Sequence, residues 1–271
     1  MFREVVIGPC RLINADCMEV LPTLAGINAT VTSPPYNQRL ETFTASGFKA
    51  EGNAKWAERI SSSYFDSMPE PEYRQWQFDV LNAVFDATQD GGSIFYNHKC
   101  RWRDKEMLHP LDLIRGTHWK IRQEIIWARD GSLTQNAKMF PPSEERIIWG
   151  FKTKWRWNDD SNRFMSVWKI NSAHNTTHPV AYPKDIPLRC IEATTNAGDT
   201  VLDPFSGSAT TGVACIELNR RYIGIERDET HFQRSCERIK QAWDLKRSEL
   251  PFEKPEPAKQ LAMFGDDEPH N

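Results

Sequence analysis

The chain has 271 residues, of which 39% are hydrophobic and 26% are charged, and its formal net charge is −3. This composition is ordinary for one large or two small folded domains, and no stretch approaches the length of a membrane span. The charge by itself does not indicate a nucleic-acid binder, because such proteins usually carry a basic surface. Scattered cysteines without a C-x-x-C pair argue against a zinc site. Since the N-terminus lacks a signal peptide, we expect a cytoplasmic protein without a membrane partner.

Short apolar, β-branched runs alternate with helix-like segments along the chain, which predicts an α/β domain with a mainly parallel sheet. The runs at 124–127 and 146–151 are joined by a Pro-containing connection without a helical pattern, so they predict an antiparallel hairpin at the sheet edge. The strands are predicted at 11–14, 29–31, 93–97, 124–127, 146–151, 200–203 and 222–226, and the helices at 69–88, 208–221 and 228–243.

Three stretches fit this alternation poorly. Residues 38–69 are polar and rich in Gly and Ser, which predicts a long insertion. Residues 152–177 begin with a basic run that is interleaved with tryptophans. After residue 243 the chain becomes charged and Pro-containing, which favours a disordered tail over 244–271. We therefore expect one catalytic domain over 1–243.

Residues 32–37 read TSPPYN, directly after the predicted strand at 29–31. Two consecutive prolines remove two backbone donors and hold the chain in an extended path, so they cannot continue a sheet. Taken alone, the motif would be interpreted as a strand exit with a packing aromatic. A second motif changes that interpretation.

The second motif lies within residues 200–226, where a strand ends at Asp203, a loop of small residues opens a helix, and a further strand ends at Glu226. This layout, with an acid about 20 positions after the loop, seats a nucleoside and places the carboxylate on its ribose hydroxyls. Ala209 occupies the second glycine position of the G-x-G-x-x-G pattern. That substitution argues against a dinucleotide, because a pyrophosphate needs close backbone approach there.

Together, TSPPY and DPFSGSATTG resemble the motifs of the S-adenosylmethionine-dependent DNA amino-methyltransferases, and the resemblance covers most of the chain. The motif order resembles the permuted β group of that family. The resemblance implies a Rossmann-like, doubly wound, mostly parallel seven-stranded sheet with an antiparallel edge hairpin. Ala209 replaces the family's usual glycine. The implied catalytic residues are Ser33, Pro34, Pro35 and Tyr36, and the implied cofactor-binding residues are Asp16, His178, Asp203, Pro204, Phe205, Ser206, Gly207, Ser208, Thr210, Thr211 and Glu226.

The first motif suits the chemistry that the resemblance implies. An exocyclic amine is a poor nucleophile because its lone pair is delocalised into the base ring. Ser33 Oγ and the Pro34 carbonyl can each accept an N–H of that amine, and Pro35 fixes the orientation of the carbonyl before it. Tyr36 offers a face for a base flipped out of the duplex, and such stacking contributes about 1 to 3 kcal/mol per base.

The residue before the two prolines bears on the target base. Family members with serine there more often methylate N4 of cytosine, and those with aspartate or asparagine more often methylate N6 of adenine. Ser33 is expected to make a neutral pocket, whereas an aspartate would add charge. Cytosine N4 is therefore favoured, with adenine N6 as the alternative.

Recognition of double-stranded DNA is assigned to residues 38–69 and 152–177, which lie outside the shared core. Both segments are short for one subunit to enclose a duplex, which suggests a homodimer. In the tail, Gln260–Phe264 reads QLAMF and resembles peptides that dock on the bacterial sliding clamp. We expect a bacterial or phage-encoded protein. Candidate phosphate contacts are Arg39, Lys49, Lys55 and Arg59.

Other functions remain open at this point. A nucleotide-dependent oxidoreductase could use the same type of sheet, but it leaves TSPPY unexplained. Methyl transfer to RNA or protein and a catalytically silent DNA-binding regulator are further alternatives. Methylation of cytosine C5 would need a cysteine nucleophile, and Cys10 is interpreted as structural. Of the possible pocket histidines His98, His174 and His178, only the last gains support from the resemblance.

Overall fold

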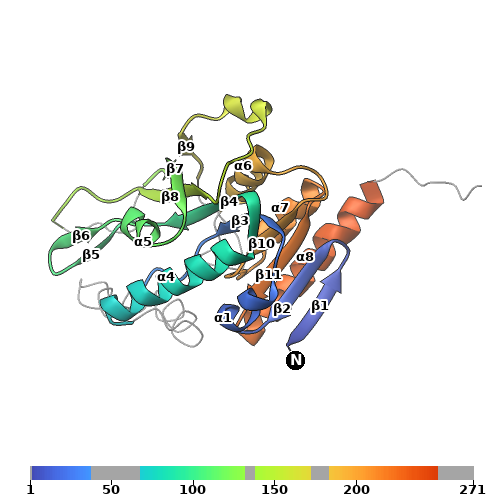
Figure 1. Ribbon diagram of the computed structural model, residues 1–271. Coiled ribbons are helices and arrows are strands. Elements are labelled where there is room, and N and C mark those ends of the chain that lie inside the picture. Colours follow the sequence, from blue (N-terminus) through green and yellow to red (C-terminus); the bar gives the residue numbers. More distant parts are fainter. Residues whose placement is uncertain (1, 38–67, 132–137, 172–182, 250–271) are drawn as a thin grey trace, which may run out of the picture.

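A nine-stranded sheet forms the centre of the computed structural model, which describes residues 2–37, 68–131, 138–171 and 183–249 (Figure 1). Its strand order is β1-β2-β11-β10-β3-β4-β8-β7-β9, and all strands except β1 and β8 run in the same direction. A separate two-stranded ribbon consists of β5 (Arg101–Arg103) and β6 (Glu106–Leu108). The strands of the main sheet are β1 (Arg3–Ile7), β2 (Cys10–Asn14), β3 (Ile27–Thr32), β4 (Thr88–His98), β7 (Lys120–Ala128), β8 (Glu144–Phe151), β9 (Val167–Lys169), β10 (Thr200–Asp203) and β11 (Arg221–Glu226).

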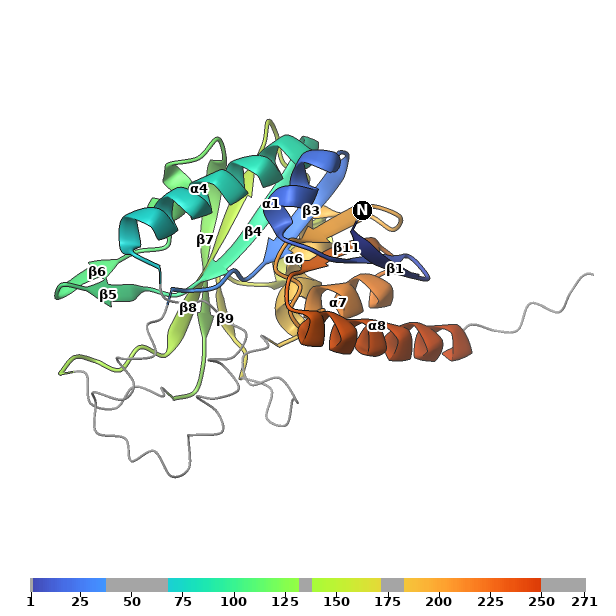
Figure 2. The same ribbon diagram turned by 90° about the horizontal axis from the view of Figure 1, so that it is seen from below.

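Helices cover both faces of the sheet (Figure 2). Alternate residues of one strand therefore enter two different cores: Ile94 and Tyr96 of β4 pack on the α4 side, and Phe95 between them packs on the other. One face carries α1 (Cys17–Val20), the short 3-10 turn η1 (Leu21–Thr23), α4 (Glu70–Ala87) and α5 (Leu111–Arg115), and the other carries α6 (Asp185–Thr194), α7 (Thr210–Glu217) and α8 (Glu229–Glu249).

Helix α4 illustrates why a polar stretch of sequence folds as a helix. Its first turn carries Glu70 and Glu72, which interact favourably with the helix dipole. Tyr73, Gln77 and Val84 then bury one stripe of the helix against the sheet. Two of these buried residues are polar, and Gln77 Nε2 donates to the Tyr73 hydroxyl at 2.9 Å. Within the described ranges, no helix is long and apolar enough to cross a membrane.

The predicted strands are confirmed, and the antiparallel pairing of β7 with β8 confirms the predicted hairpin. The expected number of strands is wrong, because β1 is added at one edge and β9 at the other. Both additions are short, and their outer positions are exposed, so neither shows the apolar run of a buried strand. Helix α8 continues to Glu249, beyond the domain end expected at residue 243.

Candidate functional site

The Ser33–Tyr36 segment follows β3 and meets polar side chains from two other strands. Ser33 Oγ lies 2.6 Å from the Tyr36 hydroxyl, which donates to Glu145 Oε2 at 2.9 Å. Asn97 Nδ2 donates to the same phenol oxygen at 2.7 Å and to the same carboxylate oxygen at 2.9 Å. Arg129 Nη1 pairs with the other carboxylate oxygen at 3.3 Å. The expectation of a neutral pocket is therefore wrong, because β8 brings the carboxylate of Glu145 into it.

The ring of Tyr36 contacts two neighbouring residues at the end of β4. The ring of His98 packs against it with centroids 4.5 Å apart, and Lys99 Nζ lies 5.8 Å from the Tyr36 centroid. Burial, and then the charge of Glu145, raise the pKa of the Tyr36 phenol well above its usual range. The phenol is consequently neutral and can donate a hydrogen bond at physiological pH.

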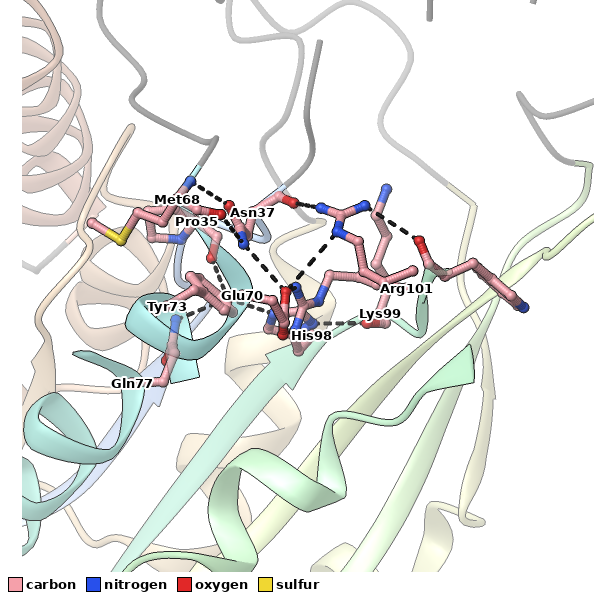
Figure 3. Close-up of polar contacts among 11 residues, drawn as sticks. Pro35, Asn37, Met68, Glu70, Tyr73, Gln77, His98, Lys99 and Arg101 are labelled. Carbon is pink, nitrogen blue, oxygen red and sulfur yellow. Dashed lines mark hydrogen bonds and ion pairs between the residues drawn. The ribbon is translucent and has the colours of Figure 1, made fainter. Parts of the chain in front are cut away.

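A second polar network holds Pro35 in place (Figure 3). The Tyr73 hydroxyl of α4 lies 2.7 Å from the Pro35 carbonyl and 2.8 Å from His98 Nε2, two acceptors that share its single proton. His98 Nδ1 faces the Lys99 carbonyl at 2.8 Å and therefore carries the ring proton. Burial, and then the charge of Arg101, lower the pKa of His98 to about 3, so the ring is neutral. The Pro35 carbonyl is thus occupied within the fold.

Asn37 closes the motif on its C-terminal side. Its side chain accepts from Met68 N at 2.7 Å and donates to Met68 O at 3.0 Å, so residues 37 and 68 are neighbours (Figure 3). Glu70 then forms a two-point ion pair with Arg101, with N–O distances of 2.6 and 2.8 Å. The predicted insertion at 38–69 lies outside the described residues except for its last two, and so do the candidate phosphate contacts within it.

Asp203 joins the two motifs. Its carboxylate accepts from Thr32 Oγ1 at 2.8 Å, directly before Ser33, and from Thr211 Oγ1 at 2.9 Å. The Phe205 amide donates a third hydrogen bond to it at 3.2 Å. Burial nevertheless raises the pKa of Asp203 to about 6. Asp203 therefore fastens the end of β3 to the start of α7.

Most hydroxyls of the predicted cofactor loop are used to brace the loop itself. Ser206 Oγ lies 2.9 Å from the Tyr222 hydroxyl. Arg238 Nη1 donates to Ser208 Oγ at 3.0 Å and to Thr210 Oγ1 at 2.9 Å. Pro204 is buried beside them. Because these side chains hold the loop in shape, any ligand at the loop meets mainly its backbone.

Ala209 occupies a left-handed backbone conformation, with φ of 56° and ψ of 38°, immediately before α7. Glycine adopts that conformation at no steric cost, whereas an L-residue pays roughly 1 to 2 kcal/mol. The glycine that is usual in the related motif therefore matches the local geometry, and alanine adopts the same turn under strain.

Two acids lie at the adjacent ends of β2 and β11, which pair in parallel with Asn14 opposite Glu226. Glu226 accepts backbone N–H groups of Gly207 at 2.9 Å and of Asp228 at 2.8 Å, and burial raises its pKa. Asp16 accepts from Met18 N at 2.9 Å. A carboxylate has about four lone-pair positions, so both acids keep acceptor capacity for hydroxyl groups.

An apolar surface completes this end of the site. The half-buried rings of Phe205 and Trp76 lie with centroids 5.5 Å apart. A nucleoside that carries an apolar substituent fits this combination of two acids, a backbone-lined loop and two aromatic rings. His178, the remaining predicted cofactor contact, lies outside the described residues.

Part of the predicted recognition segment lies away from the site. Residues 152–163 pack at the amino ends of the parallel strands, whereas Ser33 and Asp203 lie at their carboxyl ends. Three cations of this segment are bound there by the fold: Lys152 by the carbonyls of Phe85 and Thr88, Arg156 by Asp199, and Arg163 by Glu192. The structure therefore does not bring residues 152–163 to the predicted pocket, and residues 172–177 lie outside the described part.

Sequence reasoning missed Asn97, Glu145, Tyr73 and Trp76 as site residues. The first two carried a signal, because each is a polar residue at the pocket end of a predicted strand. Which polar residue faces the pocket depends on strand register, which the sequence does not display. Cys10 is fully buried on β2, and burial raises its pKa to about 12, so it has no thiolate character for carbon methylation.

Comparison with known proteins places these motifs in a family context. Residues 27–237 match the DNA methylase family of the N6/N4 methyltransferase type. The chain is 27% identical over 256 residues to the Type II methyltransferase M.BglII of Bacillus subtilis, a match covering 80% of this chain and 65% of that protein. It is 26% identical over 281 residues to the Type II methyltransferase M.SmaI of Serratia marcescens, covering 85% of this chain and 90% of that protein.

Solved structures share the fold. PvuII DNA methyltransferase, described as cytosine-N4-specific, superimposes with a TM-score of 0.66 at 16% identity, covering 88% of this chain and 93% of that one. A complex of M1.HpyAVI with SAM gives a TM-score of 0.58 at 21% identity, covering 85% of this chain and 99% of that one. At these identities the likeness concerns the fold.

Proposed function

We propose that this chain, which belongs to the DNA methylase family, is a site-specific DNA methyltransferase that moves a methyl group from S-adenosylmethionine to the exocyclic amine of a base. The observation that carries the proposal is the position of Asp203, which hydrogen-bonds both the residue before Ser33 and the first turn of α7. One carboxylate thereby holds an amine-binding motif beside a nucleoside-binding loop.

The donor side of the site is formed by Glu226, Asp16 and the 203–211 loop. S-adenosylmethionine supplies a methyl group on a positively charged sulfur when it is bound. The two acids would hold its ribose and adenine side, and Phe205 with Trp76 would provide the apolar contact. Their arrangement at the carboxyl ends of β2, β10 and β11 supports this assignment.

The acceptor side is the Ser33–Tyr36 pocket, and we assign it to N4 of cytosine. Ser33 Oγ would accept one amine N–H, and a base flipped out of the duplex would stack on the Tyr36 face opposite His98. Serine in place of an acid favours cytosine by family resemblance, while adenine N6 is the alternative. Glu145 adds a charge to the pocket without changing which residue meets the amine.

Partners of the chain follow from the proposed reaction. The substrate is double-stranded DNA, and the chain is proposed to act as a homodimer, which sedimentation with and without DNA tests directly. The clamp-binding peptide Gln260–Phe264 lies outside the described residues and stays a prediction. Its test is titration of a tail peptide into purified clamp, with Leu261 and Phe264 both changed to Ala in the control.

The decisive experiment expresses the full chain in a methylation-free bacterium. Single-molecule sequencing of the host DNA reports the modified position, and mass spectrometry of hydrolysed DNA separates N4-methylcytosine from N6-methyladenine. We expect N4-methylcytosine at one short motif, and none with the Tyr36→Ala variant as control. N6-methyladenine would overturn the choice of base, and unmodified DNA beside abundant folded protein would overturn the function.

A further inference from the structure

Glu145 is an acid that the proposed function has not yet used. It is 7% exposed at the start of β8, and its two carboxylate oxygens have different partners. One pairs with Arg129, while the other accepts from Tyr36 and Asn97. A buried carboxylate is costly unless it is paired and hydrogen-bonded. The ion pair with Arg129 and the hydrogen bond from Asn97 together meet that requirement, so the additional bond from Tyr36 calls for its own explanation.

The hydrogen bonds run in one direction, from Ser33 to Glu145. The Tyr36 oxygen receives an N–H from Asn97 at 2.7 Å, and its own proton goes to Glu145 at 2.9 Å. The 2.6 Å contact between Ser33 Oγ and the phenol must then be donated by Ser33. Asn97 Nδ2 also lies 3.4 Å from Ser33 Oγ, and because a hydroxyl oxygen has two lone pairs, one of them stays available to accept a further proton.

We propose that Glu145 receives the proton that the target amine gives up, through Tyr36 and Ser33, an inference that rests on the proposed function. As the amine nitrogen forms its bond to the methyl carbon, the carbon–sulfur bond breaks and its electron pair stays on sulfur. The nitrogen releases one proton to Ser33 Oγ, Ser33 releases its own to the Tyr36 oxygen, and Tyr36 releases its own to the carboxylate. One proton thus reaches Glu145, and every hydroxyl is restored.

The chain of hydrogen bonds from Ser33 through Tyr36 to Glu145 supplies a stronger base than serine alone. A serine hydroxyl is a weak base, whereas a carboxylate at the end of the line draws the proton away while the carbon–nitrogen bond forms. The Tyr36 phenol suits a relay because burial and Glu145 raise its pKa, so it passes a proton without holding a negative charge. Arg129 stabilises the carboxylate between turnovers.

Two buried polar atoms beside the Ser33–Tyr36–Glu145 hydrogen bonds have no hydrogen-bond partner in the described part of the chain, which is consistent with a polar group of the substrate binding there. Within the described ranges, Asn97 Oδ1 and Arg129 Nε are buried and have no hydrogen-bond partner. They are two of seven such side-chain atoms in the described residues, and Asn97 Oδ1 belongs to a residue that contacts Tyr36 and Glu145 directly. Asn97 is 3% exposed and its Nδ2 already serves Tyr36 and Glu145, so its oxygen is an acceptor for the second amine N–H in addition to the Pro34 carbonyl.

The test measures single-turnover methyl transfer from tritiated S-adenosylmethionine to DNA of a methylation-free bacterium, with both substrates saturating. We expect Glu145→Gln and Tyr36→Phe each to lower the rate about 100-fold, and the double variant to lose no more than either single variant. Affinity for S-adenosylmethionine should change less than about twofold. The control Glu144→Gln alters the preceding residue of the same strand and should keep the wild-type rate within about twofold.

A rescue variant separates proton transfer from a merely structural role. Ser33→Asp places a carboxylate directly beside the amine, so in the Glu145→Gln background it should restore the rate at least tenfold. A Glu145→Gln rate within threefold of wild type, losses that multiply in the double variant, or no rescue in a protein that still binds S-adenosylmethionine would each overturn the relay. Absence of transfer by the wild-type chain would instead overturn the proposed function.

Discussion

The Ser33–Tyr36 pocket and the 203–211 loop both lie at the carboxyl ends of the parallel strands, yet they are built in different ways. The loop is braced largely by its own neighbourhood: Thr211 bonds Asp203, and Gly207 donates to Glu226 of the next strand. The pocket instead combines side chains from β4, from β8 and from the residue after β7 with the segment that follows β3. A nucleoside loop can therefore be encoded by one contiguous segment, whereas a polar pocket is assembled across the sheet.

Strand register decides which side chains reach the pocket. In the β4–β8 pairing, His98 lies opposite Arg146, so Glu145 extends just beyond the end of β4. Asn97 lies one residue before His98 and turns toward the same carboxylate. A slip of one residue would direct Glu144 into the pocket in place of Glu145. The following predictions test whether pocket and loop are as separate in function as they are in construction.

The largest effect is expected from Tyr36→Ala. Removing the ring deletes the stacking face and leaves Asn97 and Glu145 without their shared partner, so methyl transfer should fall about 1,000-fold. Calorimetry should show affinity for S-adenosylmethionine within about twofold of wild type. As a control, Trp155→Ala removes an aromatic side chain at the amino ends of the parallel strands and should leave methyl transfer unchanged. A comparable loss of methyl transfer in both variants would contradict the assignment of the reaction to the Tyr36 pocket.

A pH-dependent effect is expected at Asp203. Burial raises its pKa from an ordinary 3.8 to about 6, so the folded protein keeps a proton that the unfolded chain has released. The resulting stability is fully present below about pH 4 and is lost as pH rises to about 6, a change of roughly 3 kcal/mol.

Urea unfolding at pH 4 and pH 7 measures this contribution by comparing the wild type with Asp203→Asn, which cannot titrate. The difference in unfolding free energy between the two proteins should shift by roughly 3 kcal/mol across that range. The exposed Asp112→Asn serves as the control. A difference that stays constant with pH would contradict the raised pKa.

A smaller effect is expected from Glu226→Gln. The change keeps the shape of the side chain but replaces one acceptor by an amide, which conflicts with the N–H of Gly207 or Asp228. S-adenosylmethionine should bind about tenfold more weakly, equal to about 1.4 kcal/mol, while the transfer rate at saturation should stay within twofold. Exposed Glu229→Gln provides the control. A large loss of rate with unchanged affinity would place this acid in the pocket rather than at the loop.

The smallest effect is expected from Ala209→Gly. Glycine relieves the left-handed conformation, but it removes a fully buried methyl group and adds freedom to the unfolded chain. These contributions nearly cancel, so the free energy of unfolding should change by less than about 0.5 kcal/mol. Ala214→Gly, in the right-handed interior of α7, should cost about 1 kcal/mol or more. Equal costs at the two positions would contradict the left-handed turn.

Much of the fold could be predicted because its signals are local. Apolar runs of strand length marked the seven inner strands, and helical spacing marked α4, α7 and α8. The outer strands β1 and β9 escaped because a strand with exposed positions lacks a continuous apolar run. Residues 152–177 were expected to recognise DNA because their first part, 152–163, is basic and aromatic. Their ion pairs with the body of the protein became visible only when α6 and β10 were placed beside them.

The sequence by itself determined the two motifs, their order and the family, because each motif depends on backbone properties of a few consecutive residues. Proline at 34 and 35 restricts the backbone wherever it occurs, and the small residues at 206–209 permit a tight turn and a close backbone approach. Tertiary structure alone decided that Glu145 and Asn97 meet Tyr36, and that Asp203 binds Thr32 rather than facing outward. Those contacts join residues far apart in the chain, so they depend on strand order and register, which no local pattern records.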